Sequence, residues 1–149
     1  MNNPINNNLI IELHVPDLGA AKDFYSKLGF ELGIYDPPNN NNPGYLTMIR
    51  KDGIGDTMLN FYGGDDRVYN QAFFNQFPKE TKRGYAVSVT IPTNDIASIY
   101  NAARAVLNGN IVREIKEIND NGKRWKDFRM VDPFGFYIRF TEIVDWGQQ

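Results

Sequence analysis

The sequence predicts an α+β fold made of two copies of a strand–helix–strand–strand–strand (βαβββ) module. Most segments alternate apolar and polar residues with a period of two, which indicates strands, and two segments carry apolar residues at helical spacing. These segments occur in the same order in both halves of the chain. An aspartate precedes each helix and a glycine follows it, at Asp17 and Gly29 and again at Asp95 and Gly109. We therefore expect an internal duplication.

Composition sets the class of protein. The chain has 149 residues, 42% hydrophobic and 13% aromatic, enough for one domain with a real core. A net charge of −2, well mixed along the chain, argues against a nucleic-acid partner. The absence of cysteine excludes disulfides and thiolate sites. Because no apolar run reaches membrane length and residues 1–8 lack signal-peptide features, we expect no membrane partner and a cytoplasmic protein.

The first module is expected over residues 9–63 of this single domain. In its first strand, residues 9–15, Ile11, Leu13 and Val15 form one face, while Ile10, Glu12 and His14 form the other. Asp17 caps a helix over 18–27, and a short strand follows at 31–35. A loop rich in proline and asparagine occupies 36–44, before paired strands at 45–50 and 57–62.

A crossover, residues 64–83, with a short helix that Pro78 ends, leads to the second module over residues 84–144. Strands are expected at 85–91, 111–118, 124–131 and 136–143, with a helix over 96–107. Asp132-Pro133-Phe134-Gly135 has the composition of a tight turn before the last strand. In that strand Tyr137, Arg139 and Thr141 form a polar face, whereas Phe136, Ile138 and Phe140 form an apolar one. We expect these apolar residues to be buried together with Ile11, Leu13, Phe24 and Leu28.

The chain resembles the vicinal-oxygen-chelate superfamily of glyoxalase I, extradiol dioxygenases, fosfomycin-resistance enzymes and bleomycin-resistance proteins. The resemblance lies in the doubled module, in Val15-Pro16-Asp17-Leu18 with Phe24-Tyr25 and Leu28-Gly29-Phe30 after it, and in Asp132-Pro133-Phe134-Gly135. It covers nearly the whole chain except the asparagine-rich loops and the crossover. It implies curled, mixed sheets that enclose a cleft, often in a dimer with exchanged modules.

The resemblance also implies where a divalent metal would bind, on four strands. Those positions hold Ile10, Asn60, Ser88 and Arg139 in this sequence. Isoleucine cannot ligate, an amide and a hydroxyl are poor ligands for a transition metal, and a guanidinium stays cationic. We therefore expect no metal site at these positions and no cofactor.

The ending Phe136-Tyr137-Ile138-Arg139-Phe140-Thr141-Glu142 resembles that of the bleomycin-resistance-like branch, in which arginine replaces the metal-binding glutamate. Proteins of that branch bind a drug as dimers, without chemistry. The resemblance thus implies a metal-free, homodimeric protein that binds a small molecule and sequesters a drug or metabolite. The candidate residues of its cleft are Glu12, His14, Asn60, Tyr62, Ser88, Trp125, Tyr137 and Arg139.

Two questions stay open from the sequence. Arg139 either pairs internally, with Glu12 as the obvious anion, or remains available for a ligand carboxylate or phosphate. The alternative function is a metal-dependent or acid–base lyase, isomerase or dioxygenase with a displaced site at Glu12 and His14. Against it, these two are the only good metal ligands on the expected inner faces, where a catalytic metal needs about three.

Overall fold

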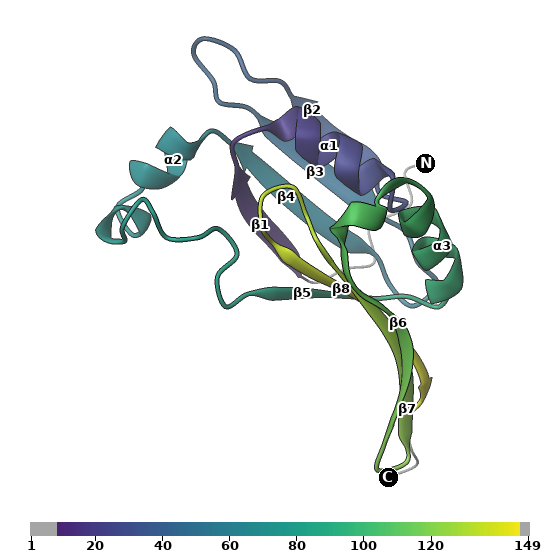
Figure 1. Ribbon diagram of the computed structural model, residues 1–149. Helices are drawn as coiled ribbons and strands as arrows, with labels where there is room; N and C mark the ends of the chain where they lie inside the picture. Colours follow the sequence, from purple (N-terminus) through teal and green to yellow (C-terminus); the bar gives the residue numbers. More distant parts are fainter. Residues whose placement is uncertain (1–8, 147–149) are drawn as a thin grey trace. The chain divides into compact units, whose positions relative to one another are not determined.

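The computed structural model describes residues 9–146, which form two compact units, each with its own four-stranded mixed sheet (Figure 1). The first unit runs to Lys51 and continues from Gly55 to Arg83, and the second takes Asp52–Ile54 and the chain from Gly84 onward. The two sheets have equivalent strand orders, β1-β4-β3-β2 and β5-β8-β7-β6. The predicted α+β class and the repeat of strand–helix–strand–strand–strand are confirmed.

The first unit contains β1 (Ile10–Val15), α1 (Leu18–Ser26), β2 (Glu31–Asp36), β3 (Tyr45–Arg50) and β4 (Thr57–Gly63). Strand β1 pairs in parallel with β4, and the other pairs are antiparallel. The Asp17 carboxylate accepts a hydrogen bond of 2.9 Å from the Ala20 backbone N–H, as expected of an N-cap. Helix α1 lies across one face of this sheet (Figure 1) and buries Phe24, Leu28 and Leu13 with it.

The crossover forms two short helices, α2 (Asp65–Tyr69) and the 3₁₀-helix η1 (Phe74–Gln76). Both end before Pro78, whose ring removes a backbone donor. One short helix was predicted here. The break at Asn70–Phe73 explains the second, because the Gln71 side chain accepts hydrogen bonds from the backbone N–H groups of Phe73 and Phe74 and starts a new turn.

The second unit contains β5 (Ser88–Pro92), α3 (Ile96–Val106), the 3₁₀-helix η2 (Asn108–Asn110), β6 (Ile111–Asp120), β7 (Lys123–Val131) and β8 (Tyr137–Asp145). Strand β5 pairs in parallel with β8, while β7 pairs antiparallel with both β8 and β6. Tyr100 of α3 packs against Phe128 of β7 at 5.1 Å between ring centroids. The helix therefore covers the face of the sheet that carries the buried apolar residues.

Two expectations about single positions were wrong. The strand predicted at 85–91 begins only at Ser88, because Gly84 and Ala86 have positive φ angles and the Val87 N–H closes a turn onto the Gly84 carbonyl. Ile11 is partly exposed rather than buried, because burial in β1 begins only at Leu13.

The turn before the last strand is confirmed. One oxygen of the buried Asp132 carboxylate accepts hydrogen bonds from the backbone N–H groups of Phe134 and Phe136, at 2.9 and 2.8 Å. Gly135 has a φ of 98°, a conformation that side-chain-bearing residues rarely adopt. This turn fixes the direction in which β8 starts, and so the side on which Tyr137 and Arg139 emerge. Within residues 9–146, no helix is long and apolar enough to cross a membrane.

Candidate functional site

The second sheet presents a polar face on the side opposite α3. Along β7 and β8 the buried residues Phe128, Met130, Ile138 and Phe140 alternate with polar ones. The polar set on the opposite face comprises Asp127, Arg129, Tyr137, Arg139 and Thr141. Strict alternation on two adjacent strands thus gathers the charged side chains on a single surface.

Three arginines on this face lie side by side on neighbouring strands. In the pairing register, Arg139 of β8 is opposite Arg129 of β7, which in turn is opposite Arg113 of β6. Thr90 of β5 extends the same row on the other side of Arg139. Like charges directly opposite one another destabilise a sheet unless an anion lies between them.

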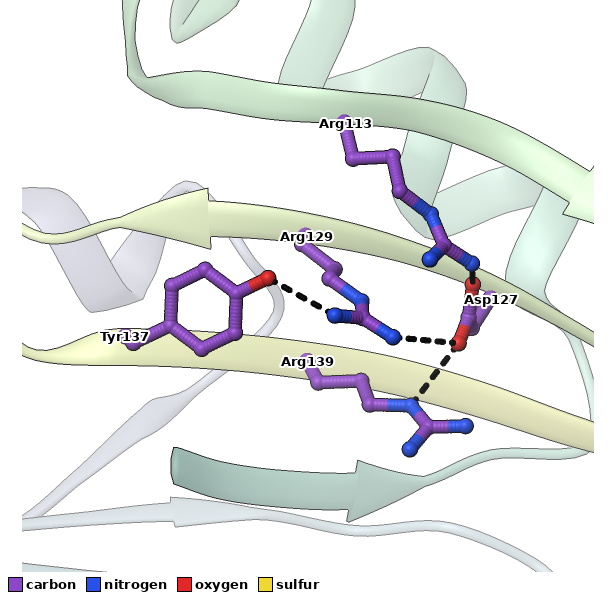
Figure 2. Close-up of polar contacts among 5 residues, drawn as sticks. All are labelled: Arg113, Asp127, Arg129, Tyr137 and Arg139. Atoms are coloured by element: carbon purple, nitrogen blue, oxygen red, sulfur yellow. Dashed lines mark hydrogen bonds and ion pairs between the residues drawn. The ribbon is translucent and has the colours of Figure 1, made fainter. Parts of the chain in front are cut away.

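Asp127 supplies that anion (Figure 2). Its carboxylate is fully buried, and one oxygen accepts a hydrogen bond from an Arg113 Nη. The other oxygen lies 2.8 Å from Arg139 Nε and 3.7 Å from an Arg129 Nη. The Arg139 contact lacks hydrogen-bond alignment and the Arg129 contact is too long for a hydrogen bond, so both are ion pairs. One carboxylate therefore holds three guanidinium groups together.

Arg129 is further held by Tyr137. Its other terminal nitrogen donates a 3.0 Å hydrogen bond to the Tyr137 hydroxyl oxygen (Figure 2). This hydrogen bond is the largest cause of a raised pKa for Arg129, and the Asp127 charge adds to it against the opposing effect of burial. The phenol thus orients the central arginine of the row.

The arginines keep unused hydrogen-bonding capacity. Their side chains are 27–29% exposed, so a solute can reach them. The buried Nε atoms of Arg113 and Arg129 have no hydrogen-bond acceptor among residues 9–146. Arg139 contacts Asp127 through Nε, and within the same range neither of its terminal nitrogens has a partner. This face can therefore accept a group rich in acceptor oxygens.

The structure corrects the predicted partner of Arg139. Arg139 pairs with Asp127, whereas Glu12 accepts a 3.1 Å hydrogen bond from the hydroxyl of Tyr62 in the first unit. The error arose because only the predicted inner-face residues were searched for an anion. In the sequence Asp127 and Arg129 are two residues apart, which places them on one face of a strand, but the register that brings them beside Arg139 is given only by the structure.

His14, in the first unit, is enclosed by rings. It stacks on Tyr62 at 5.2 Å and meets the edge of Phe74 at 5.8 Å between ring centroids. Burial, followed by the charge of Arg67, lowers the pKa of His14 against the opposing effect of Glu12. Its buried Nδ1 has no hydrogen-bond partner in the part of the chain described here. Glu12 is engaged by Tyr62, whose pKa is raised by burial and by that hydrogen bond.

The four positions at which the family resemblance implies a metal do not fit a divalent cation. Ile10 is exposed, and the buried Asn60 uses its side-chain oxygen to accept a 3.0 Å hydrogen bond from the Thr47 hydroxyl. Ser88 is an exposed residue beside Tyr137, and Arg139 is cationic. Within residues 9–146, no three His, Asp or Glu side chains come together as a metal would require.

Trp125 is the remaining predicted site residue. It lies on β7, partly buried, two residues before Asp127, and its indole N–H has no acceptor among the described residues. A separate cavity of about 540 Å³ in the same unit was not predicted. It lies beside the start of α3, and its lining residues are Ile54, Pro92, Thr93, Asn94, Lys126, Glu142, Ile143 and Val144. None of the three arginines lines it.

Solved structures similar to this chain share one architecture. A glyoxalase/bleomycin resistance protein/dioxygenase from Alicyclobacillus acidocaldarius matches with a TM-score of 0.61 and 21% identity, over 97% of this chain and 96% of its own. The chain has the glyoxalase/bleomycin-resistance fold. A bleomycin-binding protein complexed with bleomycin matches with a TM-score of 0.56 and 18% identity, over 91% of this chain and 98% of its own.

A bleomycin resistance determinant encoded on transposon Tn5 has the same fold, with a TM-score of 0.58, 19% identity and coverage of 91% of this chain and 97% of its own. No protein-family model and no curated protein sequence matches the chain. At identities of this size, the likeness to the glyoxalase/bleomycin-resistance structures establishes the fold alone. Any function must be argued from the residues of the site.

Proposed function

We propose that this protein binds a small molecule without a metal ion, through the arginine-bearing face of its second sheet. The observation that carries the proposal is the convergence of Arg113, Arg129 and Arg139 on one buried carboxylate, with donors left over. A few convergent polar groups beside an apolar sheet are typical of small-molecule sites. That a bleomycin-binding protein of the same fold was solved with its ligand supports this use of the fold.

Binding rather than catalysis is favoured by the chemistry of this face. Guanidinium groups remain cationic and donate hydrogen bonds, so they hold ligands but do not abstract protons. The carboxylate that contacts the arginines, that of Asp127, is fully buried. We therefore propose that the protein sequesters a drug or metabolite.

The alternative, a displaced catalytic site at Glu12 and His14, gains no support from the first unit. Glu12 is engaged by Tyr62, and His14 is held between rings. These two residues provide at most two ligands where a catalytic metal needs about three.

A thermal-shift screen tests the proposal. Purified protein would be heated with bleomycin, metabolite-like anions and neutral aromatic compounds, each with and without a chelator, and with divalent metals alone. We expect at least one small molecule to raise Tm by mass action, and the shift to persist in chelator. Arg139→Met should abolish most of the shift.

Arg124→Met is the matched control, because Arg124 lies on β7, is 45% exposed and has only a 3.8 Å contact with Glu117. It should leave the shift unchanged. Stoichiometric zinc, nickel, manganese or iron in the purified protein, lost on mutating Glu12 or His14, would show that the metal-free proposal is wrong.

A further inference from the structure

We infer that the ligand carries a doubly charged, tetrahedral head group of the phosphate monoester class, held by the terminal nitrogens of Arg139. This inference rests on the proposed small-molecule function of the arginine-bearing face. It names the chemistry that the face recognises.

The charge balance of the cluster points to two negative charges. Arg113, Arg129 and Arg139 are permanently cationic, and Asp127 is the only carboxylate that contacts them among residues 9–146. Two positive charges are therefore left over on partly buried groups. Because charges taken out of water are costly unless they are paired, a dianion is the solute that balances this face best.

The geometry of Arg139 provides the contact. The ion pair with Asp127 is made through Nε, and Figure 2 draws no contact from the labelled residues to either terminal nitrogen of Arg139, one of which points away from Asp127. These nitrogens offer planar, paired N–H donors, the arrangement that binds two oxygens of one phosphate or carboxylate. Asp127 thus acts as a positioning residue, because it fixes the guanidinium while leaving its outer donors open.

Hydroxyl groups extend the donor surface beside Arg139. Thr90 is its register neighbour on β5, and Ser88 is the register neighbour of Tyr137. Both β5 residues are exposed, and neighbouring strands are about 4.8 Å apart. A tetrahedral group with three peripheral oxygens can use hydroxyl donors in addition to a guanidinium pair, whereas a planar carboxylate has only two oxygens to offer.

The experiment compares four probes that differ in their head group: phenyl phosphate, benzenesulfonate, benzoate and benzamide. Titration calorimetry at about pH 7.5 should give the highest affinity for phenyl phosphate, at least roughly tenfold above the two monoanions, with no binding of benzamide. Lowering the pH to about 5.5 protonates the phosphate, whose second pKa is near 6, and should reduce that advantage. The sulfonate keeps one charge throughout and serves as the internal control.

Variants locate the contact. Arg139→Met should weaken phenyl phosphate roughly tenfold to a hundredfold, the range for losing a hydrogen bond to a charged group. Arg139→Lys keeps the charge without the paired donors, so its affinity for phenyl phosphate should lie between those of the unmodified protein and Arg139→Met. Both variants still leave Asp127 two arginines, and circular dichroism would check that they fold. Arg124→Met should bind phenyl phosphate like the unmodified protein.

The outcomes separate this inference from the proposed function. Equal affinities for phenyl phosphate and benzenesulfonate, or a loss in Arg124→Met as large as in Arg139→Met, would overturn the dianion inference. A neutral or cationic compound that shifts Tm and depends on Arg139 would also overturn it, while leaving the binding function standing. If neither the thermal-shift compounds nor the four head-group probes bind, both the proposed function and the dianion inference are wrong.

Discussion

At the scale of single residues, the second unit stabilises the charged form of a side chain, whereas the first unit stabilises the neutral form of another. In the second, Asp127 and Tyr137 stabilise the charged form of Arg129. In the first, His14 is partly buried between Tyr62 and Phe74, with the guanidinium of Arg67 near enough to disfavour a second positive charge. The environment of His14 therefore favours a neutral imidazole.

The lowered pKa of His14 predicts a loss of stability in mild acid. The unfolded chain binds a proton at the ordinary pKa of 6.5, and the folded protein binds it only at lower pH. As the pH falls below about 6.5, the unfolded state takes up more protons, so the free energy of unfolding decreases. Melting temperatures at about pH 7.5 and 5.5 would show a drop in the unmodified protein and a smaller one in His14→Gln. Equal drops would contradict the role given to His14.

The strand face on which each polar side chain lies could be predicted from the sequence, but the ion-pair partners of these side chains could not. Alternation placed Tyr137 and Arg139 on one face because a strand fixes orientation locally. The pairing of Arg139 with Asp127 depends on the register between β7 and β8, which the bulges and turns of the whole hairpin determine. Glu12 was named as the candidate internal anion because this register was not known.

At the scale of elements, local chemistry determines where helices and turns begin. The side chains of Asp17 and Asp95 accept hydrogen bonds from the backbone N–H groups of Ala20 and Ser98, and each starts its helix where the sequence predicts it. The prediction failed at the start of β5, where Ala86 adopts a positive φ that no propensity favours. The helix starts, which depend on a few neighbouring residues, could be predicted from the sequence, whereas the start of β5 could not.

The turn before β8 gives a test at this scale. Asp132→Ala removes the acceptor of two backbone N–H groups, so we expect a loss of about 2–4 kcal/mol in the free energy of unfolding. Asp132→Asn keeps an oxygen at the same place and should lose less than half as much. Urea denaturation measures both. Equal losses in the two variants would indicate that the charge, rather than the acceptor, stabilises the turn.

At the scale of the whole molecule, we propose a symmetric homodimer formed through the outer part of β8. Strand β5 pairs with β8 only as far as Thr141, so on that side Glu142–Val144 has no neighbouring strand among residues 9–146. The side chains there include Ile143 at 53% exposure and Val144 at 42%, and Trp146 follows at 52%. An open strand edge with exposed apolar side chains favours association with a second copy.

Light scattering at high micromolar concentration should therefore give twice the chain mass of 17.1 kDa. A stable interface buries more than about 1,000 Å² in total, so a single buried charge at its centre should disrupt it. We expect Ile143→Lys to give monomers, while Val112→Lys, at an equally exposed position on β6, leaves the dimer intact. A monomeric unmodified protein, or dimeric Ile143→Lys, would rule out this interface.

In each sheet the first strand of the module pairs with the last strand of the same module. This pairing has a consequence for the synthesis of the chain. All strands of the first sheet lie between Ile10 and Gly63, and all strands of the second come after them. The parallel pair β1–β4 can therefore form while β5 is still being translated, without waiting for any later segment. Each sheet also avoids loop closures across the full length of the chain, which slow folding. The duplicated architecture thus allows vectorial folding on the ribosome, one half after the other.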